Sequence, residues 1–249
     1  GATPQEQAQL DSILGNAYFR LGYNANRFFD FDRAVESYRV LADSERFTKS
    51  SAPSLVEARE GALINAAKIL EYRQQYERAA TYYKRAADVL RDANERRAAA
   101  FRVAEMSFKL KQWAKAQREM QDFIAKYKAD PAAGELLVEA YSRIADTRRE
   151  LKQPLEPALK DIVTAFAQSG QKAGSFAAER AAKAQFTLVD KGAADFDKFA
   201  VSPGKPASLK VYVDGVKGQI EAGAKQAKSK AESYNDIPPY RRPTWTIAA

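Results

Sequence analysis

The 249-residue chain contains no cysteine and no histidine. It therefore cannot form a disulfide, a thiolate or imidazole metal site, a Ser-His-Asp triad or a Cys-His dyad. Only carboxylate, lysine, tyrosine and arginine side chains remain for proton transfer, so an enzyme would need a carboxylate pair or a buried lysine. The lack of cysteine fits an oxidising compartment and the cytosol equally well, which leaves the compartment open.

Long apolar runs and phosphate-binding glycine loops are also missing. No apolar run reaches the ~20 residues of a membrane helix, and no basic-then-apolar leader is present. Neither a Walker-type loop nor a dinucleotide fingerprint occurs, so we expect no cofactor and no membrane insertion by this segment. The net charge of +8 leaves an acidic partner, an anionic surface or solubility alone as explanations.

Alanine and charged residues dominate what is present. Alanine accounts for 47 of the 249 residues, and Asp, Glu, Lys and Arg together make up 29%. This mixture favours helix and disfavours sheet, so we expect an all-α fold of about eleven helices.

An internal repeat is visible in three blocks of eight residues. Each block has an aromatic residue first, an alanine fourth and a large residue last, and the blocks are 31–38, 76–83 and 113–120. An amphipathic stretch precedes each block. These pairs predict stacked helix-turn-helix units, and the alanines at 34, 79 and 116 are expected to be buried where the two helices of a pair meet. The extra residues 23–29 correspond to about two helical turns and are expected to lengthen the first helix.

A fourth, weaker unit is expected at 136–166. Asp130-Pro131 would start it, because aspartate caps free amides and proline needs no N–H donor at the first helical position. Ser54 and Glu57 have the spacing of a capping box and predict another helix start.

The last third of the chain is more irregular. We expect a helix over 176–199, a break at 202–206 and a long amphipathic helix over 208–233. Residues 235–243 contain three prolines and are expected to be non-helical, with a new helix near Thr244.

These patterns divide the chain into three segments. Residues 1–4 are expected to be a disordered start left by tag removal, and residues 5–169 to form about four repeats. Residues 170–249 are expected to form a helical extension whose proline-rich link at 235–243 leads into a truncated further repeat. We therefore expect a fragment of a longer protein.

The motif residues resemble the tetratricopeptide-repeat (TPR) family over about 8–168. The resemblance is carried by Leu14-Gly15-Asn16-Ala17-Tyr18, Ala34, Tyr38, Tyr76, Ala79, Tyr83, Trp113 and Ala116. It implies a right-handed α-solenoid of antiparallel helix pairs whose first helices line a concave groove. It also implies a non-catalytic scaffold that binds a partner peptide or helix in that groove.

The positions that line the concave groove in the TPR family correspond to eleven candidate binding residues in this sequence. The expected anchors among them are Phe19, Arg20, Tyr72, Arg102 and Phe108. The full set is Asn16, Phe19, Arg20, Asn65, Lys68, Tyr72, Arg102, Glu105, Phe108, Arg143 and Arg149, together with Asp146 and Lys109 from the same faces.

Some TPR proteins grip a peptide's terminal carboxylate with five polar side chains. Asn16, Asn65 and Arg102 occupy three of these positions, but Ser12 and Ala98 stand where the clamp has lysines. Most of the neutralising charge is absent, which argues against a working clamp.

A second resemblance concerns residues 28–35 and 242–245, which are similar to stretches of the large TPR proteins of myxobacterial gliding motility. It implies a periplasmic or outer-membrane-associated scaffold in a cell-envelope complex, with the cytoplasm as the alternative.

The sequence leaves three alternative functions open. A rigid spacer within a longer repeat array would need no binding groove. Nucleic-acid binding would rest on the pairs at 96–97, 148–149 and 241–242, but acidic residues are interspersed and no aromatic-basic platform repeats. A helical lytic enzyme would need one of the carboxylate pairs 57/60, 135/139 or 195/197, which are better explained as helix caps and ion-pair partners. We expect no catalytic residue and no metal site.

Overall fold

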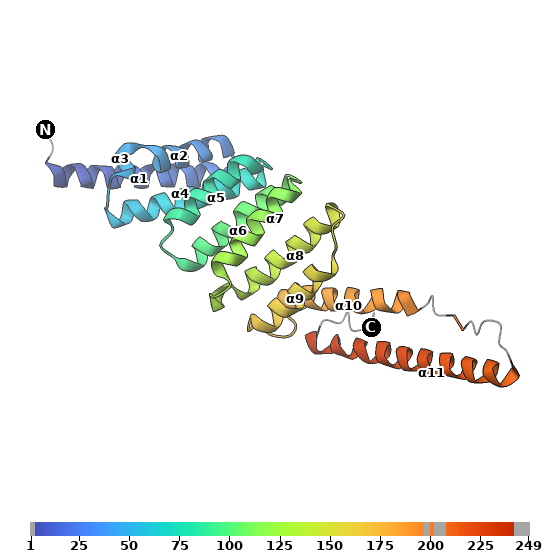
Figure 1. Cartoon of the computed structure of the whole chain (residues 1–249). Helices are drawn as coiled ribbons and strands as arrows, with labels where there is room; N and C mark the ends of the chain where they lie inside the picture. Colours follow the sequence, from blue (N-terminus) through green and yellow to red (C-terminus); the bar gives the residue numbers. More distant parts are fainter. Residues whose placement is uncertain (1–2, 197–199, 202–207, 242–249) are drawn as a thin grey trace. The chain divides into compact units, whose positions relative to one another are not determined.

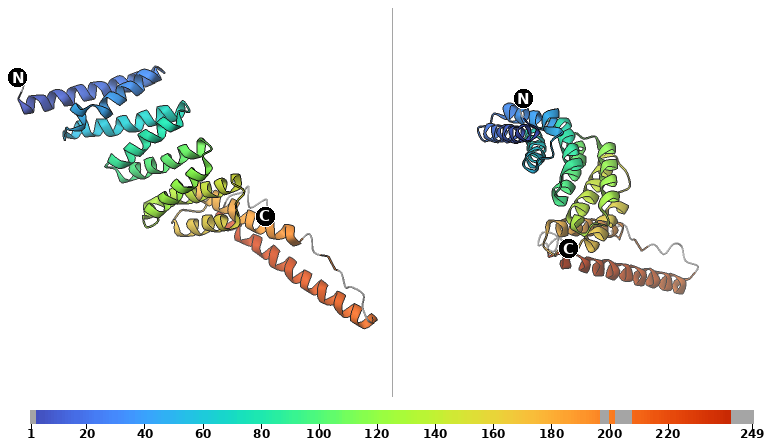
Figure 2. Two further views of the ribbon diagram at one scale, coloured as in Figure 1. Left: turned by 45° about the horizontal axis from the view of Figure 1, so that its top comes forward. Right: turned by 90° about the vertical axis from the view of Figure 1, so that its left-hand side faces the viewer.

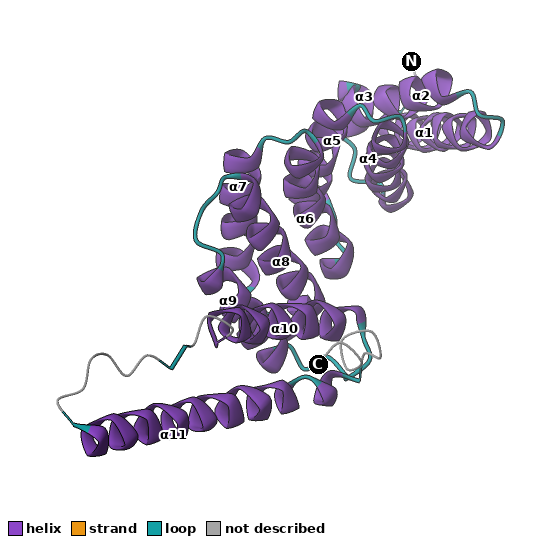
Figure 3. Cartoon of the chain, turned by 90° about the vertical axis from the view of Figure 1, so that its right-hand side faces the viewer, coloured by secondary structure: helices purple, strands orange, loops and turns teal. Residues whose placement is uncertain are grey.

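The fold is all-α, as the composition predicts. The computed structural model describes residues 3–196, 200–201 and 208–241. These contain eleven α-helices and three 3-10 turns, and no strand is found among them (Figure 3). None of the described helices combines the length and apolarity that crossing a membrane requires.

The chain divides into two compact units, 1–127 and 128–249. The first unit contains the three predicted hairpins, in which adjacent helices also pack from one pair to the next (Figures 1 and 2). Their helices are α1 (Pro4–Arg27) with α2 (Phe31–Asp43), α4 (Pro53–Tyr72) with α5 (Tyr76–Val89), and α6 (Ala93–Lys109) with α7 (Trp113–Tyr127); α3 (Glu45–Thr48) is a single turn after α2.

The alanines that anchor the repeat lie in the core. Ala34, Ala79 and Ala116 are fully buried, and Ala158 is 1% exposed. The first helix contributes close contacts of the same kind, because a Cβ on Gly22 would lie 2.7 Å from Cε1 of the Tyr38 ring. Small residues therefore let the paired helices approach closely, as the repeat pattern predicts.

The same turn joins the two helices of every pair. Phe29, Gln74, Lys111 and Lys152 each have left-handed backbone, with φ between 54° and 61°. The N–H of the following residue donates to the carbonyl five residues before it, at 2.8–3.0 Å. These bonds satisfy carbonyls at the helix end. The turn recurs although each of these side chains makes the left-handed conformation unfavourable.

Helix starts agree only in part with the sequence. Thr3 caps α1 in a capping box with Glu6, so the helix begins at Pro4 inside the segment expected to be disordered. The Asp130 carboxylate accepts from Ala132 N–H, and Pro131 follows it, but they begin a 3-10 turn, η1 (Pro131–Ala133), ahead of α8 (Gly134–Glu150). The capping box at Ser54 is wrong: α4 starts at Pro53 after Ala52, which places Ser54 inside the helix. The lengthening of the first helix is confirmed, because α1 continues to Arg27.

The second unit holds a fourth hairpin, α8 (Gly134–Glu150) with α9 (Glu156–Gln168). The helix α10 (Phe176–Phe196) packs on both of them, and α11 (Leu209–Ser233) follows. The segment 235–243 was expected to be non-helical, but its described part contributes to two 3-10 turns, η2 (Tyr234–Asp236) and η3 (Pro238–Tyr240). The tyrosines of these turns pack on Phe186 and Phe166, which holds the proline-rich segment in place. The break at 202–206 and the helix expected near Thr244 lie outside the described residues.

Candidate functional site

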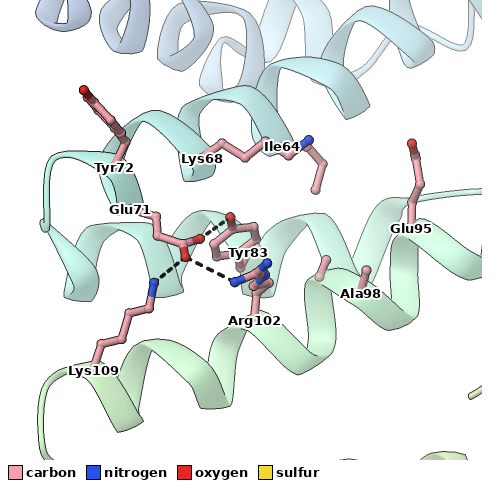
Figure 4. A pocket seen from close by; sticks show the side chains of 10 residues that line it. Ile64, Lys68, Glu71, Tyr72, Tyr83, Glu95, Ala98, Arg102 and Lys109 are labelled. Carbon is pink, nitrogen blue, oxygen red and sulfur yellow. Dashed lines mark hydrogen bonds and ion pairs between the residues drawn. The ribbon is translucent and has the colours of Figure 1, made fainter. Parts of the chain in front are cut away.

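One cavity of the first unit lies between two first helices, α4 and α6. It has a volume of about 490 Å³, and Tyr83 of α5 lies between the two helices at its base (Figure 4). Helix α5 packs against both α4 and α6, so the second helix of one hairpin forms the floor under neighbouring first helices. We call this cavity the central groove, and its lining residues are Ile64, Lys68, Glu71, Tyr72, Tyr83, Glu95, Ala98, Ala99, Arg102 and Lys109.

The Glu71 carboxylate occupies the middle of the central groove. It accepts hydrogen bonds from the Tyr83 hydroxyl and from Nζ of Lys109, each at 2.6 Å. Arg102 Nη1 lies 3.3 Å from the same oxygen that Lys109 contacts. Figure 4 shows the three donors converging on this one side chain. Glu71 therefore acts as an internal counterion for two cations of α6.

These contacts shift the acidity of the group. Burial by itself raises the pKa of Glu71, but the hydrogen bonds from Lys109 and Tyr83 and the charge of Arg102 outweigh burial and lower the pKa below its ordinary value of 4.5. Burial, and then the hydrogen bond to Glu71, raise the pKa of the Tyr83 hydroxyl well above its usual range. Glu71 is thus ionised and Tyr83 is a hydrogen-bond donor at neutral pH.

The two ends of the central groove are more open. Tyr72 is 73% exposed, and its ring packs on Phe31 at 5.6 Å between centroids. Lys68 and Glu95 are exposed and form no side-chain ion pair or hydrogen bond within the part of the chain that the structure describes. An aromatic ring and two uncompensated charges are therefore accessible to a ligand.

Three of the eleven predicted binding residues line the central groove: Lys68, Tyr72 and Arg102. Phe19 is instead half-buried, with its ring 5.8 Å from Tyr38 and against Gly61. The predicted anchor Phe108 is half-buried too, with its ring 5.2 Å from Trp113, and Glu105 is only 5% exposed. Adjacent positions on a first helix can face the groove or the core. The side chains of Phe19, Glu105 and Phe108 face the core.

The remaining candidates lie outside this cavity. Asn16 donates to the backbone carbonyl of Ser12, and Arg20 is exposed on α1. Arg143 and Arg149 belong to α8 of the second unit, where both pair with Asp146.

The clamp positions have intramolecular partners, which agrees with the sequence argument against a clamp. The Asn65 amide donates to the Tyr38 hydroxyl at 3.3 Å, and the Asn16 amide donates to the Ser12 carbonyl of the same helix. Arg102 forms an ion pair with Glu71.

Lys109, which the sequence places on the groove face with Arg102, also lines the cavity, whereas Glu71, Tyr83 and Glu95 were not predicted as groove residues. Lys109 follows Arg102 by seven residues, two helical turns, which puts both on one face of α6. Tyr83 was assigned to the repeat motif alone. The position of Glu71 depends on how two hairpins stack, which no local pattern reports.

Some members of the carboxylate and arginine pairs on which the alternative functions depend have partners within the chain. Glu60 accepts from Arg91, and Glu139 pairs with Arg143 and Arg180. Arg97 is buried, and Arg148 donates to the carbonyl of Pro154. Asp197 lies outside the described residues. No group of three carboxylates in the described ranges is close enough to hold a metal ion.

Comparisons with known proteins find similarity in structure only. No known protein-family profile matches the chain, and no curated protein matches it. The chain is similar to two crystal structures of nearly identical TPR-like repeats of a Podosopora anserina protein described as a kinesin light chain. One is a point variant, 15% identical over 89% of this chain and 98% of its own, and the other is 14% identical over 84% and 96%; both have a TM-score of 0.47. Similarity at this level carries nothing about partners, and the repeat fold rests on the helix pairs, turns and buried alanines of the chain itself.

Proposed function

We propose that this chain is a non-catalytic protein-interaction scaffold whose central groove binds an extended peptide of a partner protein. The observation that carries the proposal is the 490 Å³ cavity between α4 and α6, with an exposed tyrosine and uncompensated charges at its rim. Binding pockets usually combine apolar walls with a few polar groups that set orientation. Here Ile64, Ala98 and Ala99 supply the walls.

The charges of the groove indicate the chemistry of the peptide. Lys68 has no internal partner, whereas Arg102 and Lys109 share Glu71. An acidic side chain or terminal carboxylate on the peptide would pair with Lys68 and, by displacing Glu71, with the α6 cations. Tyr72 would cover an apolar side chain beside it. We therefore expect a peptide that carries a carboxylate next to an apolar residue.

The test is partner capture by crosslinking mass spectrometry in the native cell, followed by binding with purified variants. Lys68→Glu/Tyr72→Ala changes two exposed side chains and is expected to lower affinity at least about tenfold. The matched control, Arg20→Glu/Tyr23→Ala, makes the same kinds of change on α1, outside the cavity, and is expected to retain binding. Equal losses in both double variants, with unchanged circular dichroism, would contradict this location of the site.

An assembly role in a longer repeat array is the second candidate, and one observation favours it. Helix α11 exposes Leu209, Val213 and Ile220, each more than half accessible. A chain that captures no partner but self-associates in sedimentation, and loses this on Leu209→Glu/Val213→Glu, would support the assembly role over the groove.

We further propose that the scaffold acts in the periplasm or at the outer membrane of a bacterial envelope or motility complex. The support for this is the resemblance of residues 28–35 and 242–245 to gliding-motility proteins. Cell fractionation followed by protease accessibility tests it, and recovery only in the cytoplasm would contradict it. Hydrolysis of peptidoglycan or salt-sensitive binding of oligonucleotides would contradict the non-catalytic scaffold.

A further inference from the structure

A second cavity of the first unit shares no lining residue with the central groove. It has a volume of about 370 Å³ and is lined by residues of α5, α6 and α7. Its walls combine aromatic rings with carboxylates: the rings of Phe123 and Tyr127 pack at a tilt of 45° with centroids 4.9 Å apart, and Asp88, Glu119 and Asp122 line the same cavity. We call it the acidic cavity.

The acidic side chains of this cavity are poorly compensated. Asp88 and Asp122 are exposed and form no ion pair in the described ranges, while Glu119 has only Lys115 at 3.8 Å. Lys84 and Lys126 also line the cavity, and Lys126 Nζ lies over the Tyr127 ring at 5.3 Å. Among the lining residues, three carboxylates thus face two ammonium groups, one of which already has an aromatic partner; Lys115, which pairs with Glu119, does not line the cavity.

Two polar atoms among the lining residues have no hydrogen-bond partner. They are Oε2 of Glu119 and the hydroxyl of Tyr127, both buried, and Tyr127 as a whole is only 8% exposed. Buried polar atoms nearly always have partners, and an unsatisfied one is unfavourable. A carboxylate oxygen is an acceptor only, and a phenol oxygen also accepts, so a donor-rich group satisfies both atoms.

We propose that the acidic cavity binds a basic segment of a partner protein, with arginine as the preferred side chain. A guanidinium offers five donors and stacks on aromatic faces, which matches the carboxylates and the Phe123–Tyr127 pair. A metal ion fits poorly, because no three carboxylates in the described part of the chain converge closely enough to hold one. Glu119 and Tyr127 are eight residues apart on one helix, about 12 Å along its axis, so an extended segment reaches both ends while a single ammonium does not.

The net charge of the chain makes this proposal easy to test. At +8, the protein as a whole repels a basic peptide, so binding of one requires a local acidic site. The probe is a fluorescently labelled eight-residue peptide of alternating arginine and alanine. Fluorescence anisotropy with the full 249-residue chain at low salt is expected to show saturable binding.

Variants locate the binding. Asp88→Asn/Asp122→Asn is expected to weaken binding at least about tenfold, because each exchange removes a charged acceptor. Tyr127→Phe keeps the ring, removes the orphan hydroxyl, and is expected to weaken it about threefold. The control Glu57→Gln/Glu77→Gln changes net charge equally through two exposed carboxylates outside the cavity, and is expected to bind as the parent does.

Three outcomes would overturn the proposal. The first is no binding of the labelled peptide by the parent chain, and the second is equal weakening in the control variant. The third is that spermidine displaces the labelled peptide as effectively as unlabelled peptide does at the same concentration of positive charge. The last would identify a free polyamine as the ligand in place of a protein segment. Lys68→Glu/Tyr72→Ala is expected to leave this binding intact, which separates the acidic cavity from the central groove.

Discussion

Replacing Gly22 by alanine tests the close packing on which the first hairpin depends. The added Cβ would lie 2.7–2.9 Å from three atoms of the Tyr38 ring, which is 1% exposed. The ring cannot swing away easily, because it is enclosed in the core and its hydroxyl accepts from Asn65. Overpacking of this kind is unfavourable by about 1–3 kcal/mol, whereas alanine gains about 1 kcal/mol over glycine in helix propensity. We expect a net loss of about 1 kcal/mol in the free energy of unfolding of the first unit.

The same substitution at Gly215 provides the control. Both glycines are in long helices, but no atom comes within 4 Å of a Cβ at Gly215, so only the propensity gain remains there. Urea unfolding by circular dichroism gives the global effect, and hydrogen exchange resolved by peptide assigns it to each unit. Gly22→Ala should speed exchange in α1 and α2, and Gly215→Ala should slow exchange in α11. A Gly22→Ala protein as stable as the parent would refute the packing argument.

Two further predictions concern the central groove and the repeated turn. Glu71→Gln should lower stability by about 1–3 kcal/mol at neutral pH, since it leaves Lys109 and Arg102 without their counterion. Because the pKa of Glu71 is depressed in the folded state, its contribution to stability is complete above the ordinary value of 4.5 and is lost as pH falls through the folded value. The parent and the Glu71→Gln protein should therefore have similar stability in acid. A difference that persists in acid, measured by urea titration, contradicts the ion-pair account. Lys111→Gly should stabilise the third turn by about 0.5–1 kcal/mol, because glycine adopts a φ of 57° without strain, and an unchanged or lower urea midpoint would contradict this.

Much of the fold could be predicted because the residues of each repeat motif lie close together in the sequence, within one helix. The blocks around Ala34, Ala79 and Ala116 report the second helix of each pair directly, and the length of α1 follows from the residues before Asp30. Ser54 shows where local signals mislead: it has the spacing of a cap, but Pro53 already begins the helix, and proline is favoured at that first position. Here the position of the proline, and not the spacing of Ser54 and Glu57, marks the start of the helix.

The candidate site was less predictable for a geometric reason. Lys68, Tyr72 and Arg102 could be found by projecting a known groove onto helix faces. Phe19 and Phe108 could not be separated from them, because an aromatic side chain on a first helix serves core and groove equally well. The large volume of a phenyl ring and the presence of Gly61 and Trp113 opposite turned these two inward.

The Glu71 carboxylate has a consequence for how occupancy of the central groove responds to ionic strength. A ligand carboxylate that takes over Lys109 and Arg102 exchanges one ion pair for another, so the number of paired charges at these two cations is the same before and after. Added salt screens the ion pairs equally before and after binding, so only the ligand's contact with Lys68 makes the affinity depend on salt concentration. The affinity for a peptide that carries a carboxylate should therefore change far less between dilute buffer and physiological salt than the three cations of the groove suggest.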